Sequence, residues 1–390
     1  MTEQRNDPKS ATAQPRFTPG DPAPWFRLPC GEQAEFNLSV IAGRYVVLSF
    51  FGSATAPGVA RELKALLAER ALFDDDRIMF FGISCDHADE SEGRVRPSIP
   101  GVRYFRDYDR GVSLAYGAAA AKGGYAPATL VLDPALRVIA CVPYDEPRGH
   151  AALVTAVLRG LPPPALHARI EMTAPVLIVP RVFEPGFCRA LIAYYESRGG
   201  EDSGFMREVK GKTVALSDHA HKRRADCVIE DPALRESALS RVRRRLLPEI
   251  VKAFHYRATR MERYIVSCYD GSTGGYFRPH RDNTSKGTAH RRFAVTLNLN
   301  AEEYEGGELR FPEFGPRLYK PPTGWAAVFS CTLLHEAMPV TKGRRYAFLP
   351  FLYDEAGAEL RERNNEFLGD NVEPYRAKTP PKKKPAPAPA

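Results

Sequence analysis

Residues 269–282, which read YDGSTGGYFRPHRD, decide the fold of the C-terminal half of the chain. They join an apolar, strand-like segment (RYIVSCYDG) to a polar triplet, and glycine and proline mark the turns. Further short apolar segments follow: RRFAVTLNLN, GELRFPE, GWAAVFSC and RRYAFLPFLYD. Many short strands between Gly/Pro turns are typical of an all-β sandwich or jelly roll. Helical patterns in EPGFCRALIAYYESRG and in residues 231–257 predict helices packed outside it.

The polar triplet carries the first candidate chemistry. On a strand, His280 and Asp282 stand at i and i+2 and therefore point to the same side. His335 ends another apolar segment, AAVFSCTLLHE. Two histidines and one carboxylate form the facial triad of non-haem Fe(II) oxygenases, which leaves three metal positions open. Arg345, ten residues after His335, offers a bidentate fork for a carboxylate. The combination predicts a metal site that also holds an anion.

At these residues the sequence resembles the Fe(II)/2-oxoglutarate dioxygenases of the prolyl-4-hydroxylase-like branch. The resemblance covers about residues 175–355 and is carried by 269–282, 291–300, EGGELRFP (305–312) and HEAMPVTKGRRYAF (335–348). It implies a double-stranded β-helix, or jelly roll, as the fold. The implied roles are iron ligation by His280, Asp282 and His335, pairing of Arg345 with the distal carboxylate of 2-oxoglutarate, and co-substrate contacts by Tyr269 and Asn298.

The resemblance also implies the reaction. Fe(II), 2-oxoglutarate and O2 would be required, with ascorbate as a further cofactor, and 2-oxoglutarate would be decarboxylated to succinate and CO2 while a substrate is hydroxylated. Peptidyl proline, another side chain and a small molecule all stay open as substrates. The oligomeric state also stays open.

Several residues have competing interpretations. Arg344 competes with Arg345 as the anion anchor, and the two point opposite ways on a strand. His219 and His221 repeat the i, i+2 spacing but lack a matching carboxylate and arginine, which favours a loop that faces solvent or substrate. His290 is interpreted as structural. The basic run Arg241, Arg243, Arg244 and Arg245 is interpreted as one solvated helix face.

The N-terminal half alternates strands and helices. Apolar strands at 44–52 and 77–85 flank a helical pattern at 59–73, a hairpin at 128–144 follows, and a helix at 150–161 closes the half, which predicts an α/β sheet. GDPAPWFRLP (20–29), VVLSFFGSATAPGVARELKAL (46–66), FFGISCD (80–86) and YAPATLVLD (125–133) resemble the thioredoxin/peroxiredoxin superfamily.

The peroxidatic cysteine of that superfamily is missing here. Counted from Thr55, Gly58 stands at its position, so the half is interpreted as a non-catalytic module. The resemblance also predicts a cis bond before Pro127. Cys85 is interpreted as a buried core thiol. The alternative function is a thiol peroxidase that uses Cys85 or Cys30, and a third is an inert module whose basic helix and lysine tail bind an acidic partner.

Composition limits the remaining possibilities. The net charge is +8, and four of the positive charges lie in the last fourteen residues, so no basic nucleic-acid surface is expected. No apolar run suits a membrane span, the N-terminus has no apolar leader, and the dispersed cysteines favour a reduced, cytoplasmic protein. The predicted segments are a disordered lead-in (1–20), a thioredoxin-like domain (21–162), a linker (163–174), a dioxygenase domain (175–356) and an extension with a Pro/Lys-rich tail (357–390).

Overall fold

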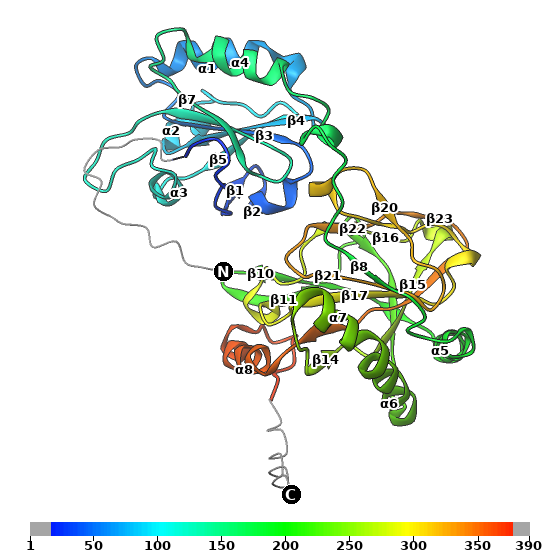
Figure 1. Ribbon diagram of the computed structural model, residues 1–390. Coiled ribbons are helices and arrows are strands. Elements are labelled where there is room, and N and C mark those ends of the chain that lie inside the picture. Colours follow the sequence, from blue (N-terminus) through cyan, green and yellow to red (C-terminus); the bar gives the residue numbers. More distant parts are fainter. Residues whose placement is uncertain (1–16, 377–390) are drawn as a thin grey trace, which may run out of the picture. The chain divides into compact units, whose positions relative to one another are not determined.

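A computed structural model describes residues 17–376 of the chain (Figure 1). These residues form two compact units: one runs to Ala174 and includes 311–317, and the other comprises Pro175–Arg310 together with the residues from Leu318 onward. Most of the predicted lead-in and the Pro/Lys-rich tail at 377–390 lie outside the described residues. Among the described residues, no helix is long and apolar enough to cross a bilayer.

The first unit is a seven-stranded mixed sheet with helices on its faces. The strand order is β2-β1-β5-β4-β3-β6-β7, in which β3, β4 and β5 are parallel and β6 and β7 form the predicted hairpin. Figure 1 shows α1 and α4 side by side over one face. The bounds are β1 Arg27–Cys30, β2 Gln33–Asn37, β3 Tyr45–Gly52, α1 Val59–Ala68, β4 Ile78–Ser84, α2 His87–Ser91, β5 Val102–Arg106, α3 Gly111–Ala115, β6 Ala128–Leu132, β7 Val138–Pro143 and α4 His150–Arg159.

The apolar pattern of this unit explains its layers. Strands β3 and β4 are buried along their whole length, as expected for central strands covered on both faces. The prediction of a cis bond before Pro127 is wrong: among the described residues the cis peptide is Ile99–Pro100. The physical reason is local, because an X-Pro bond prefers trans by only about 0.5–1 kcal/mol and the surrounding loop selects the isomer.

The second unit is a double-stranded β-helix built from two facing sheets. The major sheet has the order β14-β25-β17-β24-β15-β13-β9, with β21 and β8 joined to it through β17. The minor sheet has the order β12-β16-β22-β19-β20. The major-sheet bounds are β8 Leu177–Val179, β9 Glu201–Asp202, β13 Ala225–Val228, β14 Arg260–Glu262, β15 Ile265–Asp270, β17 Phe293–Asn298, β21 Ala326–Ser330, β24 Arg344–Phe348 and β25 Phe351–Tyr353. The minor-sheet bounds are β12 Lys222–Arg223, β16 Tyr276–His280, β19 Leu309–Arg310, β20 Leu318–Tyr319 and β22 His335–Ala337.

Two short antiparallel pairs and four helices complete this unit. The pairs are β10 (Phe205–Val209) with β11 (Lys212–Leu216) and β18 (Glu305–Gly306) with β23 (Val340–Lys342). The helices are α5 Pro185–Arg198, α6 Pro232–Arg241, α7 Leu247–Phe254 and α8 Glu355–Arg363. The single helix predicted at 231–257 contains a π-helical turn over Val242–Leu246. Pro248 explains this turn, because proline has no N–H and its ring crowds the preceding turn.

Alternation along the major sheet separates the core from the site. Val266, Leu297 and Phe348 belong to one core cluster with Leu191 of α5 and Leu246 of the π-helical turn. Residues one position away therefore face the inside of the β-helix.

The basic run on α6 and its extension is not a purely solvated face. Arg241 Nε lies 2.7 Å and Arg245 Nη2 2.5 Å from the carboxylate oxygens of Glu184, the N-cap residue of α5. The two arginines therefore fasten one helix to the start of another, which corrects the prediction from sequence.

Candidate metal centre and co-substrate pocket

The minor sheet brings three potential metal ligands together. His280 on β16 is paired directly with His335 on β22, and Asp282 follows two residues after His280 with its N–H donating to the Cys331 carbonyl oxygen at 2.9 Å. Asp282 Oδ1 lies 3.6 Å from His280 Nε2, and Oδ2 lies 3.3 Å from His335 Nε2. All three ligand atoms lie within 4.8 Å of one another. One divalent ion fits among them.

Backbone contacts orient both imidazoles toward that point. His280 Nδ1 lies 2.8 Å from the Arg278 carbonyl oxygen, and His335 Nδ1 lies 3.0 Å from the Leu333 carbonyl oxygen. A ring that donates from Nδ1 to a carbonyl presents an unprotonated Nε2, which is the form that binds a metal. Each histidine uses the carbonyl two residues before it, so the local strand geometry fixes the ring.

The electrostatics of the site suit metal binding. Burial and the neighbouring His335 lower the pKa of His280 to about 4, so this imidazole is neutral at neutral pH. Burial by itself would raise the pKa of Asp282, but the two histidines outweigh it and hold that pKa well below its ordinary value. A neutral imidazole and a charged carboxylate need not lose protons when a metal enters.

A pocket opens in front of the three ligands. Phe277 stacks on His280 with ring centroids 3.5 Å apart, and Phe329 meets His335 edge-on at 4.6 Å. The lining residues are Arg224, Arg263, Tyr269, Phe277, His280, Asp282, Ala294, Val295, Thr296, Leu309, Phe329, His335, Ala337, Arg345, Leu349 and Phe351.

Arg345 enters this pocket with donors to spare. It is 2% exposed, and neither Nε nor Nη1 has a hydrogen-bond partner among the described residues. The buried hydroxyl of neighbouring Tyr304 is unpartnered in the same sense. Buried donors without acceptors are costly, and a carboxylate between them would satisfy all three. Arg344 points the other way, where its Nε donates to Asp270 at 2.9 Å.

The two predicted co-substrate residues have different positions. Tyr269 lines the pocket, its ring lies 4.8 Å from the Arg345 guanidinium carbon, and Arg224 Nη1 donates to its hydroxyl at 3.3 Å. Asn298 is not among the lining residues. Its Nδ2 donates instead to the Pro321 carbonyl oxygen at 2.7 Å, and Thr296 of the same strand face lines the pocket.

Sequence reasoning did not find Arg224, Arg263 or Tyr304. Arg224 lies between β12 and β13 and Arg263 between β14 and β15, about twenty to sixty residues before the histidine triplet, so no spacing links them to it. Tyr304 directly precedes the EGG turn at 305–307, and a Cβ added at Gly307 would lie 3.0 Å from Arg345 Cδ. The EGG motif could therefore have pointed to the Arg345 subsite, because Gly307 has no side chain and so leaves room for the arginine.

The remaining histidines have structural contacts. His290 Nε2 lies 3.1 Å from Glu262 Oε2 in a buried pair. His219 Nε2 lies 3.1 Å from Asp202 Oδ2 at the surface. His221 packs against Phe205 and Phe277.

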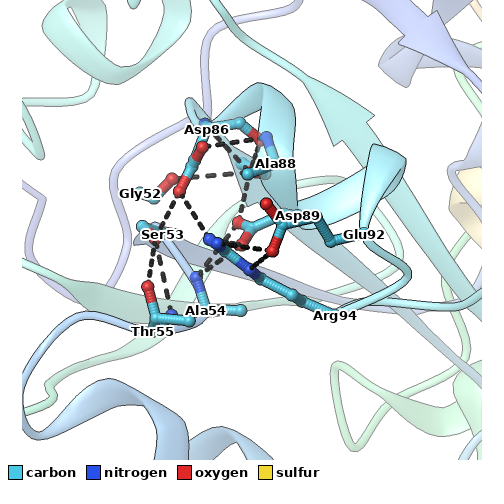
Figure 2. Close-up of polar contacts among 10 residues, drawn as sticks. Gly52, Ser53, Ala54, Thr55, Asp86, Ala88, Asp89, Glu92 and Arg94 are labelled. Carbon is cyan, nitrogen blue, oxygen red and sulfur yellow. Dashed lines mark hydrogen bonds and ion pairs between the residues drawn. The ribbon is translucent and has the colours of Figure 1, made fainter.

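In the first unit, a polar network occupies the place of a thiol site (Figure 2). The Ala54 N–H donates to both oxygens of fully buried Asp89, at 3.1 and 3.0 Å, and Ser53 Oγ donates to Asp86 Oδ2 at 2.8 Å. Arg94 forms ion pairs with both aspartates. Gly58 caps α1 at φ 79°. The loop is thus held by carboxylates and carries no cysteine.

The cysteines do not compensate for that loss. All seven are unpaired. Burial raises the pKa of Cys85 and of Cys30, whereas a nucleophilic thiol needs a lowered pKa.

The fold and the site together define the class: a thioredoxin-like domain followed by a double-stranded β-helix that holds a 2-His-1-carboxylate cluster. Comparison with protein families agrees. Residues 19–140 match the AhpC/TSA family, and residues 264–353 match the 2OG-Fe(II) oxygenase superfamily. The chain therefore joins a peroxiredoxin-like domain to a 2OG-Fe(II) oxygenase domain, as both resemblances predicted.

Individual relatives match one domain each. A PKHD-type hydroxylase of Pseudomonas fluorescens is 38% identical over 91 residues, which are 21% of this chain and 39% of that protein. The chain thus matches about two fifths of that relative's length. A Trichoplax adhaerens prolyl hydroxylase, solved with a hypoxia inducible factor peptide, is 19% identical with a TM-score of 0.36, over 48% of this chain and 87% of that chain. Peroxiredoxin Q of Xanthomonas campestris is 20% identical with a TM-score of 0.29, over 34% and 89%.

Proposed function

We propose that this protein is an Fe(II)- and 2-oxoglutarate-dependent dioxygenase that hydroxylates an organic substrate and releases succinate and CO2. The observation that carries the proposal is the convergence, in one buried pocket, of His280, Asp282 and His335 with the unpartnered donors of Arg345. Iron ligation by two imidazoles and one carboxylate, plus a guanidinium for the far carboxylate of a keto-diacid, is the donor set that this chemistry needs.

The chain's own residues have distinct tasks in this proposal. His280 and His335 donate Nε2 to the metal while their backbone contacts keep the rings from turning. Asp282 supplies the negative charge. Arg345 and the Tyr304 hydroxyl bind the distal carboxylate, and Tyr269 contacts the co-substrate from the side. Bound iron with 2-oxoglutarate and O2 supplies the oxidising chemistry, and Phe277 and Phe329 exclude water from it.

The finer parts of the proposal rest on the prolyl-hydroxylase-like resemblance. The substrate is a peptidyl proline, another side chain or a small molecule. Ascorbate acts as a reductant, which its omission from the assay tests. The predicted contact of Asn298 with the co-substrate has no support from its position, so Thr296 is the better candidate on that strand. Seven unpaired cysteines support a cytoplasmic location.

The peroxiredoxin-like domain is proposed to be non-catalytic. The raised pKa values of its thiols argue against a thiol peroxidase.

The test is a matched pair of arginine variants. Succinate release from 2-oxoglutarate is measured with Fe(II) and O2 in the intact chain, in Arg345→Gln and in Arg344→Gln. Both substitutions remove one positive charge from the same strand, but only Arg345 faces the pocket. We expect Arg345→Gln to raise the KM for 2-oxoglutarate at least about tenfold, which corresponds to one lost charged contact, and Arg344→Gln to leave it unchanged. Iron-independent turnover, or equal behaviour of the two variants, would contradict the proposal.

A further inference from the structure

Two arginines of the pocket lining, Arg224 and Arg263, have no direct contact with iron or 2-oxoglutarate in the proposed function. Arg224, directly after β12, and Arg263, before β15, both contact Asp226: Arg224 Nη2 at 2.6 Å and Arg263 Nη2 at 3.1 Å. Asp226 also accepts from Ser267 Oγ at 2.6 Å and from Ser203. We call Arg224 and Arg263 the arginine pair.

The arginine pair has donors left over. Arg224 is 7% exposed, and its Nε has no partner among the described residues. Asp226 already receives four donors. The Arg263 side chain is 29% exposed and lines the pocket. Among the described residues, Arg224 therefore keeps an unpartnered Nε in the pocket lining, and Arg263 adds a partly exposed guanidinium to it.

Charge counting points to an anion. A ferrous ion and 2-oxoglutarate carry opposite double charges, and Asp282 and Arg345 carry opposite single charges, so these four neutralise one another. Asp282 is the one acidic residue in the pocket lining. Asp226 compensates only one member of the arginine pair, and the next acid, Glu262, is already bound by Arg291 and Arg361. One positive charge therefore stays uncompensated at the pocket when the site is loaded.

The pKa values of the neighbouring basic groups show which of them carry a positive charge beside the pocket. Burial and the adjacent Arg224 lower the pKa of Arg263 to about 10, which still leaves it charged at neutral pH. Burial lowers the pKa of Lys222 to about 5, so it adds no charge there. Arg263 also has φ +67°, a left-handed conformation that costs a non-glycine residue about 1–2 kcal/mol. Strained backbone of this kind is found more often at active and ligand-binding sites than elsewhere.

We propose that the arginine pair is the substrate-recognition site and that the substrate carries a carboxylate, which binds Arg263 and Arg224. This inference rests on the proposed dioxygenase function and narrows its substrate class. The carboxylate binds beside the metal at the arginine pair rather than at the Arg345 subsite. The Arg224 and Arg345 guanidinium carbons both lie over the Tyr269 ring, at 5.7 and 4.8 Å, so this ring contacts both subsites.

The test uses a panel of N-acetyl amino acids, each paired with its own carboxamide. The full-length chain is loaded anaerobically with Fe(II) and 2-oxoglutarate, and each compound is titrated while the metal-to-ligand charge-transfer band is followed. We expect at least one acid to shift the band and to bind about tenfold or more tightly than its carboxamide, since a charged contact is lost with the amide. In air the same acid should accelerate succinate release.

Three variants locate the effect. Arg263→Gln should weaken the acid about tenfold and leave the charge-transfer band of bound 2-oxoglutarate in place. Arg263→Lys keeps the charge and should bind the acid with intermediate affinity. Arg244→Gln removes the same charge from an exposed helix outside the pocket and should change nothing.

Four outcomes would overturn the inference: equal binding of acids and carboxamides, no binding by any acid, unchanged affinity in Arg263→Gln, or an equal loss in Arg244→Gln. Absence of the band in the unaltered protein is a different result, because it overturns the proposed function itself.

Discussion

Gly307 offers a sharp test of how the anion subsite is built. A Cβ at this position would lie 3.0 Å from Arg345 Cδ, 3.0 Å from Val340 Cγ2 and 3.2 Å from Tyr304 Cε2. These contacts are tighter than ordinary van der Waals distances. In Gly307→Ala, Arg345 and Tyr304 must therefore shift by a few tenths of an ångström, and the donors proposed to hold the distal carboxylate move with them. Gly307 also has φ +69°, so alanine adds backbone strain of about 1–2 kcal/mol.

Gly274→Ala separates the strain from the displacement. Gly274 has a similar φ of +63°, but a Cβ there would meet nothing within 4 Å. Both variants should lose about 1–2 kcal/mol of unfolding free energy in denaturant titrations. Only Gly307→Ala should also weaken 2-oxoglutarate, by about tenfold, the loss expected for one misplaced charged hydrogen bond. Anaerobic titration of the iron-loaded protein with 2-oxoglutarate measures this dissociation constant.

The two variants also define the result that would refute the reasoning. If 2-oxoglutarate binds both with equal affinity, then Arg345 is not held by the close approach of Gly307 or does not contact the co-substrate. If Gly307→Ala weakens iron binding as well, the substitution disturbs more than the anion subsite.

Three further predictions follow from buried polar groups. Tyr304→Phe removes an unpartnered hydroxyl, so it should raise the KM for 2-oxoglutarate severalfold without lowering the midpoint of thermal unfolding. Burial lowers the pKa of His150 from 6.5 to about 4 in the folded protein. As the pH falls, this imidazole is therefore protonated in the unfolded chain before it is protonated in the folded one. The first domain should therefore be most stable above pH 6.5, and its free energy of unfolding should fall by up to about 3 kcal/mol as the pH is lowered to 4. Urea titrations at several pH values measure this loss, and His150→Gln should remove most of the pH dependence. Cys85→Ser should leave peroxide consumption with a thiol reductant at its background rate, and a loss of such activity would favour the peroxidase alternative.

Much of the site could be predicted because it depends on local periodicity. His280 and Asp282 share a side because they are two residues apart, and Arg344 and Arg345 diverge because they are adjacent. The strands of the first domain were predictable from unbroken apolar runs such as residues 44–52, since central strands are buried on both faces.

The rest depends on contacts between distant segments. Asn298 has the strand position expected of a pocket residue, but its side-chain Nδ2 donates a hydrogen bond to the Pro321 carbonyl oxygen. Arg224 and Arg263 flank opposite ends of the paired strands β13 and β15, and their side chains meet because both reach Asp226 on β13. The pattern of the basic run does not predict that Glu184 binds Arg241 and Arg245. Pairings of this kind are set by tertiary packing and leave no periodic signal.

The measurement closest to the central claim is an anaerobic titration of the Fe(II)-loaded chain with 2-oxoglutarate. The account predicts a charge-transfer absorption that saturates at one equivalent of iron, disappears in His280→Ala, and forms in Arg345→Gln only at higher 2-oxoglutarate concentration. A chain that binds no ferrous ion, or one that shows the same absorption after His280→Ala, would contradict it.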